Sequence, residues 1–285
     1  MINTLNMIQH NADEPSIMGI LNCTPDSFYE GSRKQTAYDI ACRADEIIAQ
    51  GGRIIDIGAF STRPGADMVS ADEELRRMRM ALEIVRKGHP EALLSIDTYR
   101  PEVARMAVEE YGAQMINDVS EGGITGIVDT ALDGEMTAED GVPAIFREVA
   151  RLGVAYILMS VQADMDGMIA NFRKEVAMLR SLGVGEIILD PGFGFGKEVL
   201  TGNYRVLSEM HRLREEFPGL PLLAGVSRKR MIWQLLGCSA QDTGALYGTM
   251  LVNMVALQQG ASILRVHDVK EAAETIRLYR AMHNS

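Results

Sequence analysis

Short apolar runs alternate with longer amphipathic stretches along almost the whole chain. The runs occupy 17–21, 53–57, 93–96, 114–116, 155–159, 187–189, 222–226 and 263–266. Their length and their continuous apolar character are typical of strands buried on both faces of a parallel sheet. Between them, apolar residues recur at helical spacing and predict helices at 36–50, 70–86, near 143–151, 168–182, 204–217, 242–259 and 270–282. A further helix begins at Pro101.

Local signals support two of these helix starts. Ser70 is followed three residues later by Glu73, which is the spacing of a capping box. Pro101 stands where the missing backbone N–H of a first helical residue costs nothing. The acidic, glycine-containing stretch 121–141 fits neither pattern, and we interpret it as an insertion at the surface.

Eight strands that alternate with helices predict an α/β fold, the (β/α)8 TIM barrel. A length of 285 residues suits one such domain, with residues 1–15 as an N-terminal extension. A doubly wound sheet is the alternative, because it also alternates strands and helices. It is less favoured because no GxGxxG follows the first run, and because Gly196-Lys197 is followed by Glu198 rather than by Ser or Thr.

Composition narrows the function classes. The net charge of −11 disfavours nucleic acid and anionic membranes as partners. No apolar run approaches the roughly 20 residues that span a bilayer, and the polar start of the chain lacks the apolar core of a signal peptide. Three cysteines without a CxxC pair suit a reducing compartment. We therefore expect a cytoplasmic enzyme.

Polar residues stand at the ends of the predicted strands. Because a barrel gathers the carboxyl ends of its strands at one mouth, these residues are expected to share one site. Carboxylate and amide groups suit the donor-rich edge of a nitrogen heterocycle such as a pterin or a purine, whereas basic groups suit an anion. The first kind are Asp97, Asn117 and Asp190; the second are Arg63, Lys229, Arg265 and His267. The remaining histidines show no metal-ligand spacing, so no zinc site is predicted.

Several of these motifs together resemble dihydropteroate synthase, a family of folate biosynthesis. The matching stretches are 22–28 (NCTPDSF), 56–58 (DIG), 61–65 (STRPG), 95–97 (SID), 116–118 (IND), 189–197 (LDPGFGFGK), 225–229 (GVSRK) and 265–267 (RVH). They occur in the family's order from about Ile17 to His267. The chain departs from the family pattern at Ala59-Phe60 and at Ser160-Val161, and the stretch 121–140 is longer than expected.

The resemblance implies a transferase that joins dihydropterin-CH2-pyrophosphate to p-aminobenzoate and releases pyrophosphate. It implies a magnesium ion near Asn22, a homodimer and membership of an enzyme class that is a sulfonamide target. By position, the pterin ring would be bound by Asp97, Asn117, Met159, Asp190 and Lys229. Pyrophosphate would be held by Asn22, Thr62, Arg63, Arg265 and His267, and the p-aminobenzoate pocket would be shaped by Phe28, Pro64, Phe195, Ser227 and Lys229. Arg63, Lys229, Arg265 and His267 would carry the catalysis.

Two other functions remain open at this point. A methyltetrahydrofolate–corrinoid methyltransferase would share Asp97, Asn117 and Asp190, but it has no use for Arg63, Lys229 or the motif at 265–267. A paralogue that binds pterins without turnover would need none of the leaving-group residues.

Overall fold

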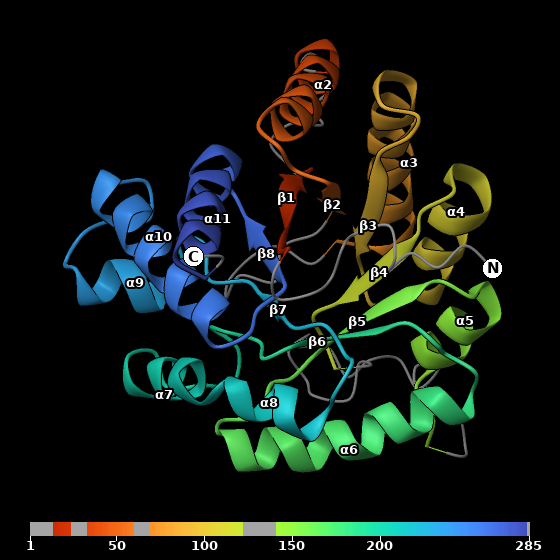
Figure 1. The fold of residues 1–285 in the computed structure, drawn as a ribbon. Helices are drawn as coiled ribbons and strands as arrows, with labels where there is room; N and C mark the ends of the chain where they lie inside the picture. Colours follow the sequence, from red (N-terminus) through yellow and green to blue (C-terminus); the bar gives the residue numbers. More distant parts are fainter. Residues whose placement is uncertain (1–13, 24–32, 60–68, 122–140, 284–285) are drawn as a thin grey trace.

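Eight parallel strands form the centre of the molecule in the computed structural model, which describes residues 14–23, 33–59, 69–121 and 141–283 (Figure 1). The strands lie in the order β6-β5-β4-β3-β2-β1-β8-β7. A parallel bridge between Leu189 and Leu222 joins β6 to the residues before β7, so the sheet closes on itself. Their bounds are β1 (Ser16–Asn22), β2 (Ile54–Gly58), β3 (Leu93–Asp97), β4 (Met115–Asp118), β5 (Ala155–Met159), β6 (Ile187–Asp190), β7 (Leu223–Ala224) and β8 (Ile263–Val266). The predicted (β/α)8 barrel is confirmed.

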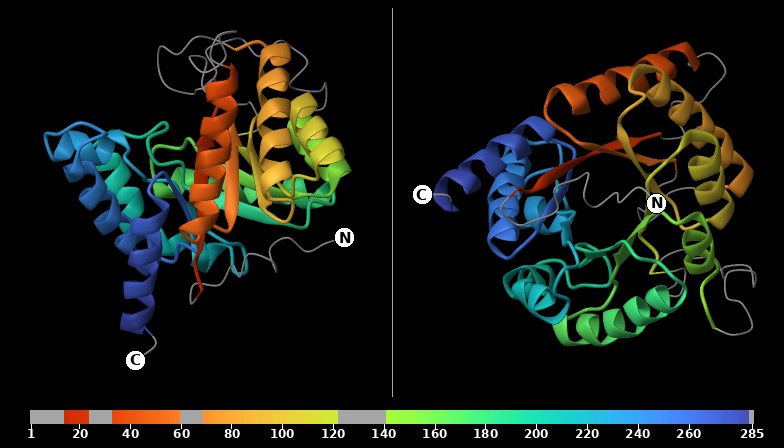
Figure 2. Two further views of the ribbon diagram at one scale, coloured as in Figure 1. Left: turned by 90° about the horizontal axis from the view of Figure 1, so that it is seen from above. Right: turned by 45° about the vertical axis from the view of Figure 1, so that its right-hand side comes forward.

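Helices surround this ring on the outside, as the two views of Figure 2 show. They are α2 (Arg33–Ala49), α3 (Ala71–Gly88), α4 (Pro101–Tyr111), α5 (Ala144–Leu152), α6 (Met165–Ser181), α7 (Thr201–Glu209), α8 (His211–Glu216), α9 (Arg230–Leu235), α10 (Thr243–Gln258) and α11 (Val269–His283). Among the residues described, no helix is long and apolar enough to cross a membrane.

The starts of α3 and α4 are as predicted, whereas one predicted helix is wrong. The Ser70 hydroxyl accepts a hydrogen bond from the Glu73 backbone N–H at 3.3 Å, and Pro101 is the first residue of α4. The helix expected over 204–217 is two helices, α7 and α8, that meet at the fully buried Met210. The extension 1–15 and the acidic stretch 121–141 lie almost wholly outside the described residues.

One apolar layer fills the barrel interior toward the amino-terminal ends of the strands, and every strand contributes to it. We call this layer the barrel plug; it consists of Met18, Ile54, Leu93, Met115, Ala155, Ile157, Ile188, Leu223 and Ile263. Because strand side chains alternate between faces, the residues two positions further along also point into the barrel. On each strand, the inward residue two positions after the plug residue therefore lies between the barrel plug and the carboxyl-terminal mouth.

Candidate active site

A layer of polar side chains lies next to the barrel plug, on the side of the carboxyl-terminal mouth. On β2, β3 and β4 the inward residue two positions after the plug is Asp56, Ser95 and Asn117, and all three are buried. On β6 and β8 the same step leads to Asp190 and Arg265. The alternation of the strands, and not any local motif, therefore brings these five residues into one layer.

Arg265 joins three strands through this layer. Its Nε lies 2.6 Å from Asp56 Oδ2, and its Nη2 lies 2.7 Å from Asp97 Oδ2. Asn117 donates a hydrogen bond from Nδ2 to the same Asp56 oxygen at 3.1 Å. A buried cation between two carboxylates offsets the desolvation of all three charges, so this cluster is held in one geometry.

Four oxygens of this cluster have no hydrogen-bond partner among the described residues. They are Asp56 Oδ1, Ser95 Oγ, Asp97 Oδ1 and Asn117 Oδ1. Leaving a buried polar group unpaired costs about 1–3 kcal/mol, so native cores rarely keep several together. Their grouping at the mouth indicates a site for a ligand that carries several N–H donors.

The electrostatics of the cluster are shaped by burial. Burial raises the pKa of Asp97 to about 7, with the Asp56 carboxylate adding to the rise and the Arg265 guanidinium opposing it. Burial acts to lower the pKa of Arg265, but the carboxylates of Asp56 and Asp97 outweigh it and raise that pKa above its ordinary value. The guanidinium of Arg265 therefore keeps its charge between the two acids.

Asp190 and Lys229 form the second part of the site. One carboxylate oxygen of Asp190 accepts a hydrogen bond from the Gly192 N–H at 2.8 Å. Burial raises the pKa of Asp190 and lowers that of Lys229 to about 8, and each charge partly offsets the shift of the other. Lys229 also donates to the Phe193 carbonyl, and its Nζ lies 4.6 Å from the centre of the Phe195 ring. The ammonium is thereby fixed between an acid and an aromatic face.

The loop after β6 approaches the end of β5 as closely as backbone allows. A Cβ added at Gly192 would lie 2.0 Å from the Ser160 carbonyl oxygen, and one added at Gly196 would lie 1.8 Å from that of Val161. Both glycines have positive φ. The contacts at Ser160 and Val161 thus involve main-chain oxygens, which any residue supplies, so the departure from the family pattern there leaves this packing intact. Met159, fully buried at the end of β5, lies against Gly192.

The loops after β7 and β8 are fastened to each other. Ser227 Oγ accepts a hydrogen bond from the His267 N–H at 3.1 Å. Arg228, with a φ of +51°, pairs with both carboxylate oxygens of Asp268 at 2.8 and 2.9 Å. The charge of Arg228 is therefore taken up by Asp268 and not by a ligand.

The structure brings together most of the predicted site residues that it describes. Asn22 ends β1, and its Oδ1 lies 3.3 Å from the place that a Cβ of Gly58 would take, beside the Asp97 side chain. Asp97, Asn117, Met159, Asp190, Phe195, Ser227, Lys229, Arg265 and His267 lie at or just beyond the carboxyl ends of their strands. Phe28, Thr62, Arg63 and Pro64 lie outside the described residues.

Asp56 and Ser95 belong to this layer but are not among the predicted site residues. Both occur in stretches that resemble the family, 56–58 and 95–97, but the resemblance gives them no role. A charged residue inside an otherwise apolar run, two positions after Ile54, was the available signal for Asp56.

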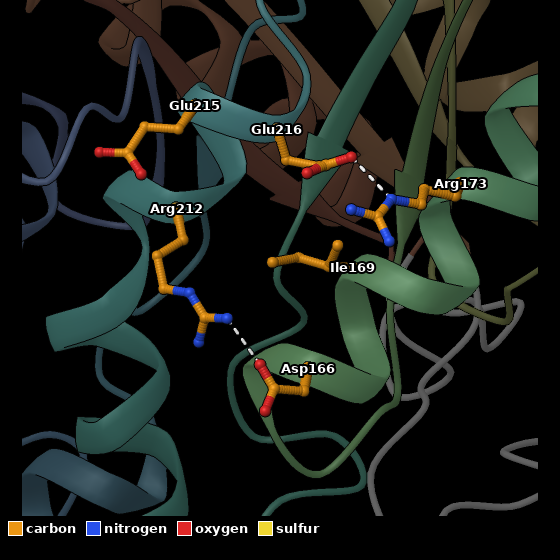
Figure 3. A pocket seen from close by; sticks show the side chains of 6 residues that line it. All are labelled: Asp166, Ile169, Arg173, Arg212, Glu215 and Glu216. Atoms are coloured by element: carbon orange, nitrogen blue, oxygen red, sulfur yellow. Dashed lines mark hydrogen bonds and ion pairs between the residues drawn. The ribbon is translucent and has the colours of Figure 1, made fainter.

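A second cleft, of about 380 Å³, lies on the flank of the barrel between α6 and α8 (Figure 3). Four of its five charged residues form two ion pairs: Arg173 Nε lies 2.6 Å from Glu216 Oε1, and Arg212 Nη2 lies 2.6 Å from Asp166 Oδ1. Such mutual pairing at the surface offers little to a ligand.

Comparison with known proteins identifies the family. The model for "pterin binding enzyme" matches residues 18–267, which include every strand from Met18 of β1 to the end of β8. The chain belongs to the pterin-binding enzyme family.

Other members of this pterin-binding family are close to the chain over their full length. Dihydropteroate synthase of Escherichia coli K12 is 37% identical over 273 residues, covering 94% of this chain and 91% of that protein. The structure of dihydropteroate synthase from Clostridium difficile, obtained with pteroic acid, superimposes with a TM-score of 0.81 at 31% identity, covering 96% and 99% of the two chains. That of Xanthomonas albilineans, with 4-aminobenzoic acid, gives a TM-score of 0.78 at 34% identity, covering 96% and 95%.

Proposed function

We propose that the chain is a dihydropteroate synthase, a transferase that condenses 6-hydroxymethyl-7,8-dihydropterin pyrophosphate with p-aminobenzoate. The observation that carries this proposal is the group of unpaired buried oxygens around Arg265, at the mouth of a pterin-family barrel. Full-length relatives at 36–37% identity bear the same name.

The unpaired oxygens suit the pterin ring. A pterin presents ring N–H and amino donors along one edge, and Asp97 and Asn117 each keep an oxygen free to accept them. Asp190 adds a buried carboxylate on the β6 side, and Lys229 provides donors beside it. Met159 offers an apolar surface at the same depth. The donors of the ring thus meet the buried acceptors of Asp97 and Asn117, which are otherwise unpaired.

Arg265, His267 and Asn22 suit the leaving pyrophosphate. Asp56 and Asp97 occupy only Nε and Nη2 of Arg265, and a guanidinium has five N–H donors, so donors remain for a phosphate oxygen. Arg265 and His267 lie on one side of the mouth, two residues apart in sequence, and Asn22 lies at the end of the adjacent strand β1. We assign Thr62 and Arg63 to the same task by their place in the STRPG motif. Charge fixed in advance where negative charge develops is the strongest kind of electrostatic catalysis.

A magnesium ion fits this arrangement as a companion of the substrate. No cluster of three or more protein metal ligands occurs among the described residues. Mg²⁺ needs few protein ligands, because it keeps waters and takes phosphate oxygens, and the Asn22 amide oxygen is a suitable hard donor. When bound, the ion would neutralise charge on the departing pyrophosphate.

We infer a dissociative displacement. The electron-rich dihydropterin delocalises positive charge from the methylene carbon once the C–O bond to pyrophosphate breaks. The amino group of p-aminobenzoate then attacks that carbon to form the C–N bond, and the nitrogen releases one proton to solvent. This amine is neutral at pH 7, so the reaction needs no strong general base. Phe195 and Lys229, together with Ser227, stand where the second substrate would enter; Phe28 and Pro64 are assigned there by motif.

The test is release of pyrophosphate when purified protein is mixed with both substrates and Mg²⁺, with dihydropteroate detected by mass spectrometry. Pteroic acid binding without pyrophosphate release would identify a non-catalytic paralogue. Methyl transfer from methyltetrahydrofolate to a corrinoid would identify the other alternative.

We also propose that the protein is a homodimer that uses α10. This helix carries no charged residue, and it exposes Tyr247, Leu251 and Val255 at intervals of four. The neighbouring α11 exposes Leu278 and Met282. Two copies that meet on an uncharged face avoid the repulsion expected at a net charge of −11. Light scattering should give twice the chain mass for the protein and a monomer for Leu251→Glu; a monomeric wild type contradicts this.

The state of the cysteines supports a proposal for the cellular compartment of the protein. Cys23, Cys42 and Cys238 are all free thiols, which supports a reducing cytoplasm as the place of action.

A further inference from the structure

Lys197, the last residue of the motif after β6, is buried outside the layer that we assign to the substrates. Its Nζ lies 3.2 Å from the Ser160 carbonyl oxygen and 3.1 Å from those of Gly192 and Phe195. A lysine ammonium has three N–H donors, so its hydrogen bonds are fully used by main-chain oxygens. The ammonium is therefore surrounded by backbone carbonyl oxygens in the way that a bound cation would be.

The loop around Lys197 needs such a cation. Gly192 and Gly196 allow the loop to lie directly against residues 160 and 161, and this contact brings several carbonyl oxygens close together. Carbonyl dipoles that face each other repel, and a positive charge between them turns that repulsion into attraction. On the other side, the Gly194 N–H donates to Asn203 Oδ1 at 2.7 Å, so the loop is held from two directions.

The charge on Lys197 is supported by its surroundings. Burial lowers the pKa of Lys197 to about 8, and the carboxylates of Asp190 and Glu121 partly oppose that fall. The ammonium therefore persists at neutral pH.

We propose that Lys197 is a positioning residue for the reaction: it fixes the loop 191–196 so that Gly192 holds Asp190 and Phe195 stays beside Lys229. The part of this inference that concerns catalysis rests on the proposed function. The groups that would be displaced are those already placed in the site, namely the Asp190 carboxylate through its 2.8 Å hydrogen bond and the Phe195 ring beneath the Lys229 ammonium.

Chemical rescue tests the proposal. Lys197→Ala removes a fragment that matches n-propylammonium in size and charge, and 1-propanol is its uncharged counterpart. We expect KM for p-aminobenzoate to rise at least tenfold in Lys197→Ala with a smaller fall in kcat, and n-propylammonium, but not 1-propanol, to reverse it. Lys174→Ala, at an exposed position of α6, is the matched control and should behave as wild type. Kinetics within twofold of wild type, or equal rescue by both compounds, would overturn the proposal.

Hydrogen exchange tests the loop without substrates, so it stays informative even if the protein releases no pyrophosphate. Amides in 191–196 should exchange at least tenfold faster in Lys197→Ala than in Lys174→Ala, and n-propylammonium should slow them again. If Lys197→Ala does not fold, Lys197→Gln keeps two donors without the charge and should show the same loss in milder form. Unchanged exchange in a folded variant would show that the ammonium does not hold the loop.

Discussion

Asp190→Asn removes a buried negative charge from the proposed pterin site and keeps the shape of the side chain. An asparagine oxygen can still accept the hydrogen bond from the Gly192 N–H, which spans 2.8 Å. The backbone around residue 190 is also held by strand pairing with Met159 and by the hydrogen bond from the Ser160 N–H at 2.9 Å. The change should therefore alter ligand binding more than folding.

The size of the effect follows from the burial of the carboxylate. Asp190 is 6% exposed, and the positive charges of Lys229, Arg265 and Lys197 act on it. Removing one partner of a buried, charge-assisted contact to a ligand costs about 2–5 kcal/mol, which is about 30-fold to a few thousand-fold in affinity. The asparagine amide would in addition point N–H donors at the donors of the pterin.

Calorimetry with pteroic acid measures this loss directly. Asp166→Asn is the matched control, because Asp166 is an acid of the flank cleft that pairs with Arg212 (Figure 3). The control should bind pteroic acid as wild type does, and both variants should keep the thermal transition of wild type. Affinity of Asp190→Asn within threefold of wild type would refute the role given to Asp190.

Three further predictions concern stability. Burial raises the pKa of Glu175 to about 9, whereas the unfolded chain loses this proton from about pH 4.5. The free energy of unfolding therefore falls as the pH rises from about 4.5 to about 9. Glu175→Gln should remove this pH dependence, which is up to about 1.4 kcal/mol per pH unit, in thermal melts. Gly192→Ala should destabilise by more than about 2 kcal/mol in urea titrations, because it adds a backbone clash to the strain of a positive φ, whereas Gly183→Ala, with open space around it, meets the strain alone. Arg265→Met should cost about 3–5 kcal/mol in the same titrations, since it leaves Asp56 and Asp97 without their cation. Equal losses for the two glycine variants, a pH slope unchanged by Glu175→Gln, or a stable Arg265→Met would contradict the corresponding argument.

The strands could be predicted because burial on both faces leaves a continuous apolar run. This signal weakens where pairing is partial: β7 was expected over 222–226 but spans only Leu223–Ala224, and Leu222 instead makes the single bridge to β6. The break between α7 and α8 had no signal, because no Gly or Pro occurs from 204 to 217. There the fully buried Met210 marks a break that is set by packing and not by local propensity.

Part of the site could be predicted because the barrel fold fixes where the strands end. A barrel guarantees that strand ends meet, so Asp97, Asn117 and Asp190 could be grouped from the sequence. The partners that hold these groups were less visible: Asp56 lies inside a run, and Lys197 is bound by main-chain oxygens whose positions no side-chain pattern reveals.

The central claim is that one mouth of the barrel gathers Asp97, Asn117 and Asp190 around a pterin ring. A crystal structure of the protein with pteroic acid bound measures this directly. The account predicts the ring edge within hydrogen-bond distance of all three side chains, above the barrel plug and beside Lys229. A pteroic acid molecule bound elsewhere, with the oxygens of Asp97 and Asn117 still unpaired, would contradict it.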